Sequence, residues 1–380
     1  MLFLAASLLP LALAAPVIQP RGAQVIPGSY IVKFKEGTSV QDTLKGLKSV
    51  EAKHVYTNGK FKGFAADLSS KTLKTIQDLP EVDYIEQNAI FRINDVVTQA
   101  DVPWGLGRIS HRAKGATSYI YDASAGAGTC SYVIDTGIYT DHSQFQGRAT
   151  FLANYAGDNQ SVDGNGHGTH VAGTIGGVDY GVAKKTKLYA VKVLDSSGSG
   201  TTAGVIAGMD FVTADSATRS CPNGTVANMS LGGGKSTAIN AAAAAMVKAG
   251  VFLAVAAGNS DDDAQFYSPA SEATVCTIGA SDNTDTRAWF SNYGTLVDIF
   301  APGVDVLSSW IGGVNETNTI SGTSMATPHI TGLGAYLLAL LGPKTPAALC
   351  DYMKKTATVN VLTDIPSGTV NALAFNGASS

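Results

Sequence analysis

Residues 251–259 read VFLAVAAGN, an apolar run of strand length that ends in a glycine and an asparagine. Comparable runs recur along the chain with helix-like segments between them: SYVIDTG (131–137), KLYAVKVLD (187–195), GTVANMSLG (224–232) and TVCTIGA (274–280). Near-continuous apolar strands that alternate with helices are typical of a parallel sheet covered on both faces. The sequence therefore predicts one large α/β domain with a mostly parallel, twisted sheet, whose clearest helices span residues 237–248 and 324–341.

The region before this domain has a different pattern. Residues 28–35 and 82–93 read as strands, residues 54–68 as two strands joined by an Asn58-Gly59 turn, and residues 40–50 and 71–79 as helices. The order βαββαβ predicts a small ferredoxin-like α+β unit. Residues 95–105 show no clear periodicity, and we expect them to form an exposed connector.

Composition and charge narrow the functional classes. The chain has 380 residues, of which 45% are hydrophobic, and a net charge of −4 without any long Lys/Arg run. Such a chain can bury a sizeable core and is not suited to a nucleic-acid partner. Residues 16–94 carry 11 Lys or Arg and 8 Asp or Glu, about +3, which leaves about −7 for the remainder. Opposite charges would help the two parts to associate.

The chain opens with MLFLAASLLPLALAAP, an apolar stretch that contains a small-x-small pattern at Ala12-Leu13-Ala14. We interpret residues 1–15 as a secretory signal peptide, which places the protein outside the cell. A membrane anchor is the weaker interpretation because the run is short and Pro10 interrupts it. Secretion permits disulfides, and four widely spaced cysteines without a CxxC motif fit two bridges better than a zinc site: Cys130, Cys221, Cys276 and Cys350.

Three polar residues lie where a plain core would not need them. Asp135 ends the strand SYVID, His167 lies among glycines in DGNGHGTHVAGT, and Ser324 opens a helix in ISGTSMATPH. Each has an ordinary explanation as a turn residue, a loop residue or a helix cap. Together they supply a nucleophile, a base and a carboxylate that orients the base, which are the parts of acyl transfer by a serine.

These motifs resemble those of the subtilisin superfamily. PWGLGRIS, YGVAKKTKLYAVKVLD, SLGGG, AVAAGN, YSPASE and FSNYG are further similar to its proteinase K branch, particularly secreted fungal enzymes that degrade cuticle. The similarity runs from about Val102 to the C-terminus, and residues 16–94 resemble the inhibitory propeptides of the same family. The resemblance implies a subtilisin-like fold and a serine endopeptidase.

The resemblance also implies individual roles. Asp135, His167 and Ser324 would form the catalytic triad, with His170 in a structural role. The Asn259 side chain and the Ser324 backbone N–H would stabilise the oxyanion. Two segments would bind an extended substrate through its main chain: Gly198, Ser199 and Gly200, and Ser230, Leu231 and Gly232. We expect broad specificity, with large apolar or aromatic residues preferred before the cut, rather than the basic residues that a kexin-like enzyme requires.

Further sites follow from the same resemblance. The family pairing implies the disulfides Cys130–Cys221 and Cys276–Cys350. One structural calcium site would use the carbonyls of Ala273 and Val275 and the carboxylate of Asp298. No catalytic cofactor is expected. Sequons mark three possible glycosylation sites at Asn159, Asn223 and Asn315, whereas the sequon at Asn228 lies in an expected buried strand.

The predicted organisation is a signal peptide (1–15), a self-cleaving inhibitory propeptide (16–96) and a peptidase domain (97–380). We expect a monomer whose partners are protein substrates and its own propeptide, with no membrane or nucleic-acid partner. Two other classes of protein fit the sequence less well. A dinucleotide-binding oxidoreductase would need the GxGxxG spacing that GNGHGTHVAG lacks. An inactive relative acting as a binding module would be expected to have lost a reacting residue.

Overall fold

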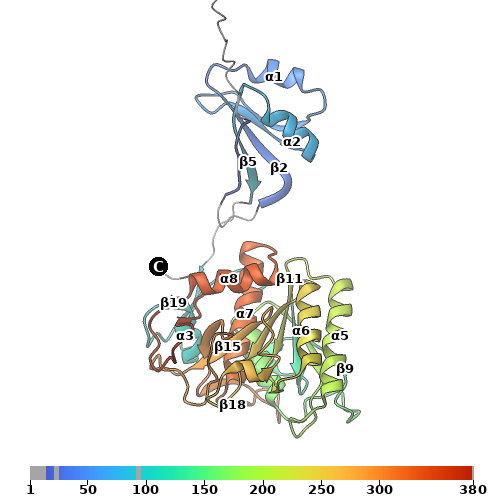
Figure 1. The fold of residues 1–380 in the computed structure, drawn as a ribbon, viewed down its shortest axis with the longest axis vertical. Helices are drawn as coiled ribbons and strands as arrows, with labels where there is room; N and C mark the ends of the chain where they lie inside the picture. The colour runs from blue at the N-terminus through green and yellow to red at the C-terminus, as the bar shows by residue number, and fades with distance from the viewer. Residues whose placement is uncertain (1–13, 21–24, 91–95, 379–380) are drawn as a thin grey trace, which may run out of the picture. The chain divides into compact units, whose positions relative to one another are not determined.

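The computed structural model describes residues 14–20, 25–90 and 96–378. The chain divides into two compact units, one up to residue 93 and the other from residue 94 onward (Figure 1). Residues 1–13 of the expected signal peptide and residues 94 and 95 of the expected maturation junction lie outside the described residues.

The first unit has the predicted βαββαβ order. It contains β2 (Val25–Phe34), α1 (Val40–Gly46), β3 (Ala52–Tyr56), β4 (Gly63–Asp67), α2 (Ser70–Gln77) and β5 (Val82–Ala89). These four strands lie in the antiparallel order β5-β2-β4-β3, and β1 (Val17–Ile18) is added parallel to β5. The predicted hairpin through Asn58-Gly59 is confirmed, because β3 pairs antiparallel with β4; its connection spans residues 57–62, in which Gly59 has φ +65°.

The second unit is built on a nine-stranded sheet in the order β19-β20-β16-β15-β13-β11-β8-β10-β9. The strands from β16 to β9 are parallel: β8 (Thr129–Asp135), β9 (Ala149–Asn154), β10 (Lys187–Lys192), β11 (Gly224–Met229), β13 (Phe252–Ala256), β15 (Cys276–Ser281) and β16 (Ile299–Pro302). At the edge, β20 (Ala372–Leu373) is parallel to β16, and β19 (Thr358–Val359) pairs antiparallel with β20. The predicted parallel sheet is confirmed.

Side chains of the central strands alternate between two cores, as the period of two requires. In β8, Tyr132 and Ile134 pack on the side of α5 (Thr202–Thr218) and α6 (Thr237–Lys248), whereas Val133 packs on the side of α4 (His167–Gly176). The long helix α7 (Thr323–Leu341) covers the same face as α4. Figure 1 shows α5 and α6 together beside the sheet.

Among the described residues, α7 is the one helix long and apolar enough to cross a membrane. However, 83% of its most apolar window is buried inside the fold. Most of the surface of α7 is therefore packed against the rest of the domain, as expected of a core helix in a layered α/β domain.

The expectation of an exposed connector at residues 95–105 is wrong in part. Residues Val96–Gln99 form β6, which pairs antiparallel with β7 (Tyr119–Asp122), and α3 (Trp104–Ser110) follows. This pairing depends on a strand about twenty residues further along the chain, so local periodicity does not reveal it. Helix α8 (Pro346–Thr356) completes the unit.

Both expected disulfides are present, Cys130–Cys221 and Cys276–Cys350. The first joins the start of β8 to the loop before β11. The second joins β15 to α8. They close sequence separations of 91 and 74 residues, and loops of that length stabilise a chain by about 4 kcal/mol each in the loop-entropy account.

Candidate active site

Asp135 is the last residue of the central strand β8, and its side chain is fully buried. Its Oδ1 accepts hydrogen bonds from the Thr136 backbone N–H (2.7 Å) and lies 2.7 Å from Nδ1 of His167. The carboxyl end of a parallel strand opens toward the edge where functional groups gather. Asp135 is therefore held rigidly with one oxygen directed at the imidazole.

His167 is the first residue of α4, and a tight glycine turn precedes it. Gly166 has φ +106°, and a Cβ placed there would come within 2.5 Å of the Trp310 ring, so only glycine fits. The turn is fixed by the buried carboxylate of Asp163. Its Oδ1 accepts from the Gly166 N–H and the Thr136 hydroxyl, and its Oδ2 accepts from Thr169. Asp163 thus fixes the backbone just before His167, at Gly166, and just after it, at Thr169.

The environment of His167 raises its pKa above the ordinary value of about 6.5. Burial alone would lower the pKa, but the charge of Asp135, the hydrogen bond to it and the charge of Asp163 outweigh burial. The imidazole keeps 24% of its side-chain surface exposed. With Nδ1 bound to Asp135, Nε2 is the nitrogen left to exchange a proton with a substrate-side group.

His170, one turn later, lies in a different environment. Its Nε2 donates to the carbonyls of Val306 and Asn318, and burial lowers its pKa to about 4. A neutral, buried histidine bonded to two main-chain carbonyls holds α4 to the hairpin formed by β17 (Val306–Ser309) and β18 (Thr317–Ile320). These contacts fit the structural role that the resemblance implies for His170.

Ser324 is the second residue of α7, where first-turn N–H groups have no intrahelical acceptor. Pro328 lies four residues later and has no N–H to bond the Ser324 carbonyl. The hydroxyl of Ser230 takes that place and donates to the Ser324 carbonyl at 2.7 Å, while the Ser324 hydroxyl donates to the Ser230 carbonyl at 3.1 Å. The proline therefore frees the carbonyl through which the serine is linked to the end of β11.

Asn259 follows β13 and is oriented by the start of α7. Its Oδ1 accepts from the backbone N–H and from the hydroxyl of Thr323, each at 2.8 Å. This fixes the amide so that Nδ2 is left for another partner. The point where a Cβ of Gly322 would stand is 3.5 Å from both Asn259 Nδ2 and the Ser324 nitrogen. The two nitrogens therefore border one small space beside Ser324.

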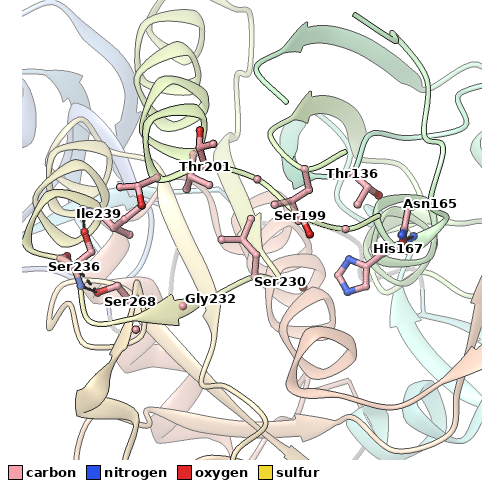
Figure 2. Close-up of a pocket in the computed structure, with 18 residues that line it drawn as sticks. Thr136, Asn165, His167, Ser199, Thr201, Ser230, Gly232, Ser236, Ile239 and Ser268 are labelled. Carbon is pink, nitrogen blue, oxygen red and sulfur yellow. Dashed lines mark hydrogen bonds between the residues drawn. The ribbon is translucent and has the colours of Figure 1, made fainter. Parts of the chain in front are cut away.

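The larger of two adjoining cavities, about 530 Å³, is called here the extended cleft (Figure 2). Figure 2 shows His167 at one end and Ser236, Ile239 and Ser268 toward the other. All six residues predicted to bind substrate line it, together with His167: Gly198, Ser199, Gly200, Ser230, Leu231 and Gly232. The two predicted segments thus face the same channel.

The second cavity, about 210 Å³, is called the primary pocket. One wall is the run from Leu231 to Gly234, which the extended cleft shares, and the other runs from Ala256 to Ser260. Thr323 and Ser324 also line it, and Tyr267 contributes an aromatic ring. None of its lining residues carries a charge, so the pocket suits an apolar side chain.

One of the predicted calcium ligands, the carboxylate of Asp298, is already paired with a cation. Asp298 has a side chain 23% exposed, and its Oδ2 accepts from the Thr277 N–H at 2.9 Å. Its Oδ1 accepts from Lys354 Nζ at 3.1 Å. The nearby sulfurs of Cys276 and Cys350 form a disulfide and cannot act as thiolate ligands. Carbonyls and one carboxylate suit Ca²⁺, but the ion would have to share Asp298 with Lys354.

Several positioning residues were not singled out from the sequence. Asp163 does not follow an apolar strand, so its position in the sequence does not mark it as a site residue. Its place in DGNG, just before a helix, is nevertheless typical of an Asp that stabilises a turn through its side chain. Thr323 could have been read as a cap, but its contact with Asn259 joins segments 64 residues apart. Lys192 is a fully buried cation whose Nζ donates to the Thr136 carbonyl and pairs with Asp158. A lysine within an apolar strand signals burial but not its partners.

Comparison with known proteins identifies the class. Residues 126–376 match the subtilase family of peptidases, and residues 29–94 match the peptidase inhibitor I9 family. The chain belongs to the subtilase family and is a subtilisin-like serine protease with an N-terminal I9 propeptide domain.

Individual relatives are similar along nearly the whole chain. A cuticle-degrading protease of Metarhizium anisopliae is 58% identical over 96% of this chain and 93% of its own length. Proteinase R of Parengyodontium album is 52% identical over 95% of this chain and 92% of its own length. The crystal structure of a cold-adapted subtilisin-like serine proteinase superimposes with a TM-score of 0.69 at 42% identity, covering 74% of this chain and all of that one.

Proposed function

We propose that this protease is a secreted endopeptidase that uses Ser324 as nucleophile, His167 as general base and Asp135 to orient and stabilise the imidazolium. The observation that carries the proposal is the 2.7 Å contact between Asp135 and His167, because His167 lines a cleft that adjoins the pocket lined by Ser324. His167 Nε2 takes the Ser324 proton as Oγ attacks the peptide carbonyl, and then gives it to the leaving amine. Water then attacks the acyl-enzyme carbonyl as His167 Nε2 takes a proton from it, and the proton returns to Ser324 Oγ when the acyl C–O bond breaks.

Oxyanion stabilisation follows from the space beside Gly322. The negative oxygen of the tetrahedral intermediate would accept from Asn259 Nδ2 and from the Ser324 N–H, and the N-terminal end of α7 adds a favourable dipole. The Ser324 hydroxyl must rotate from the Ser230 carbonyl toward His167 before attack. Catalytic hydrogen bonds are often absent or poorly aligned without substrate and form fully only when substrate binds.

Specificity is proposed from the uncharged primary pocket. Its glycine and alanine walls leave room for a large apolar or aromatic side chain before the scissile bond. The extended cleft binds the residues that precede it, through main-chain contacts with the two segments that line it. This arrangement supports broad specificity toward unfolded or extended protein substrates.

Activity assays test this proposal. A chromogenic peptide anilide with Phe before the scissile bond should be cleaved, and its Arg counterpart much more slowly, because the pocket has no negative charge.

Asn259→Ala should lower kcat by about a hundred- to thousand-fold, as for other oxyanion donors.

Ser324→Ala should abolish measurable turnover, whereas the matched exposed variant Ser321→Ala should keep it. Equal activity of Ser324→Ala and Ser321→Ala would contradict the assignment.

We further propose that residues 1–15 direct secretion and that residues 16–96 are removed by the chain's own active site. The I9 match supports a propeptide that inhibits until it is cut. Asn159 and Asn315 are exposed and are the proposed glycan acceptors. Asn223 is less suitable, because its half-buried amide donates to the Ala127 carbonyl at 2.8 Å.

Mass spectrometry of the secreted products tests self-processing. The wild-type chain should appear as a mature form that begins near residues 94–96, with hexose-containing mass added at Asn159 or Asn315. The Ser324→Ala chain, produced without any other protease, should remain unsplit at this junction. Adding a trace of wild-type enzyme to Ser324→Ala then separates cleavage within one chain from cleavage between chains. A Ser324→Ala precursor that splits at the same bond alone would refute self-processing.

For calcium, we propose that Ala273, Val275 and Asp298 bind one structural ion in competition with Lys354. Replacing Lys354 with Met should strengthen calcium binding, because the carboxylate then loses its internal cation. The thermal midpoint of Lys354→Met, in the inactive Ser324→Ala background, should rise more with added calcium than that of the parent. The exposed neighbour Lys355→Met is the control and should behave as the parent does. A calcium response that Lys354→Met leaves unchanged would contradict the competition.

A further inference from the structure

Trp289 is the most exposed large apolar side chain in the described part of the chain, at 79%. It lies at the tip of a turn closed by the Ser291 N–H bonding to the Ala288 carbonyl at 2.8 Å. Its ring meets Phe290 edge to face, with centroids 5.5 Å apart and planes at 81°. Single exposed apolar residues are ordinary on protein surfaces. The significance of Trp289 therefore depends on its location.

Main-chain bonds tie the segment after Trp289 to the segment that contains Asn259. The Phe290 carbonyl accepts from the Asp261 N–H at 2.9 Å. The Asn292 N–H donates to the Gly258 carbonyl, and its Oδ1 accepts from the N–H of Ser260. Trp289 thus precedes Phe290, whose carbonyl is bonded to Asp261, and Asp261 lies two residues after Asn259, the proposed oxyanion donor.

The side of the site on which Trp289 lies follows from the two walls of the primary pocket. The wall from Leu231 to Gly234 is shared with the extended cleft, which holds the residues before the scissile bond. The opposite wall ends at Ser260, and the turn that carries Trp289 is bonded just beyond it. The turn that carries Trp289 therefore lies beyond the wall of the primary pocket that faces away from the extended cleft.

The exposed ring of Trp289 determines the kind of partner that it would bind. Arg287, which is 6% exposed, pairs with Asp261 at 2.8 Å and with Asp364 at 3.2 Å, so one of these two negative charges is offset. The indole ring itself is uncharged and 79% exposed. Such a ring gains most from stacking on an aromatic or aliphatic side chain.

We propose that Trp289 is a specificity-determining residue for the leaving-group side of the substrate. It binds a large apolar side chain in one of the three residues that follow the scissile bond. This inference rests on the proposed function and adds to it a second site of apolar selection, separate from the primary pocket.

Paired substrates test the role of Trp289. Internally quenched peptides that share one sequence before the scissile bond would carry either Leu and Phe or Ser residues after it. A peptide anilide of the same sequence has no residues on that side. Trp289→Ser should lower kcat/KM about five- to tenfold for the apolar peptide and leave the Ser peptide and the anilide unchanged. Trp289→Phe should restore most of the loss.

The control is Val359→Ser, which removes a side chain 55% exposed in the edge strand β19 and should change none of the three rates. An equal fall of all three rates in Trp289→Ser would show a structural defect and overturn the proposal. Unchanged rates for both peptides would place Trp289 outside the substrate path and also overturn it. Failure of the wild type to cleave even the anilide would instead contradict the proposed function, and this inference with it.

Discussion

The hydrogen bond between the buried Asp135 carboxylate and His167 is the constraint on which the rest of the site depends. A charged group without solvent exposure is costly unless bonded, and here Oδ1 accepts from the Thr136 N–H as well as facing the imidazole. Because Asp135 ends a strand with parallel neighbours on both sides, its position is set by the sheet. His167 must come to it, and the turn stabilised by Asp163 is what brings α4 there.

The nucleophile is fixed independently, through the carboxyl ends of β11 and β13, at the same edge of the sheet as Asp135. Ser324 is linked to the end of β11 through Ser230, and Asn259 at the end of β13 is linked to the start of α7 through Thr323. These contacts join strand ends to a helix that is far away in sequence, so the site forms only when α7 has packed on the sheet. The two disulfides restrict the opposite edge of the sheet, because each has one cysteine at the start of a central strand.

Much of this could be predicted from the sequence, for reasons that differ between features. The apolar strands, α6 and α7 have strong local patterns, and the motifs around Asp135, His167 and Ser324 are specific to one family. The pairing of β6 with β7, the length of the β3–β4 connection and the contact of Lys354 with Asp298 were not predicted, because each depends on residues brought together only by tertiary packing. Trp289 was missed for a related reason: in the sequence it is merely an aromatic residue within a turn.

The charge of Asp135 makes His167 a stronger base than burial alone would allow. NMR titration of the His167 ring in the inactive Ser324→Ala chain measures this directly, with and without Asp135→Asn. We expect a His167 pKa above about 6.5 when Asp135 is present. We expect a lower pKa in Asp135→Asn, because burial then acts without the opposing charge. A His167 pKa at or below the ordinary value, unchanged by Asp135→Asn, would show that Asp135 does not tune the base.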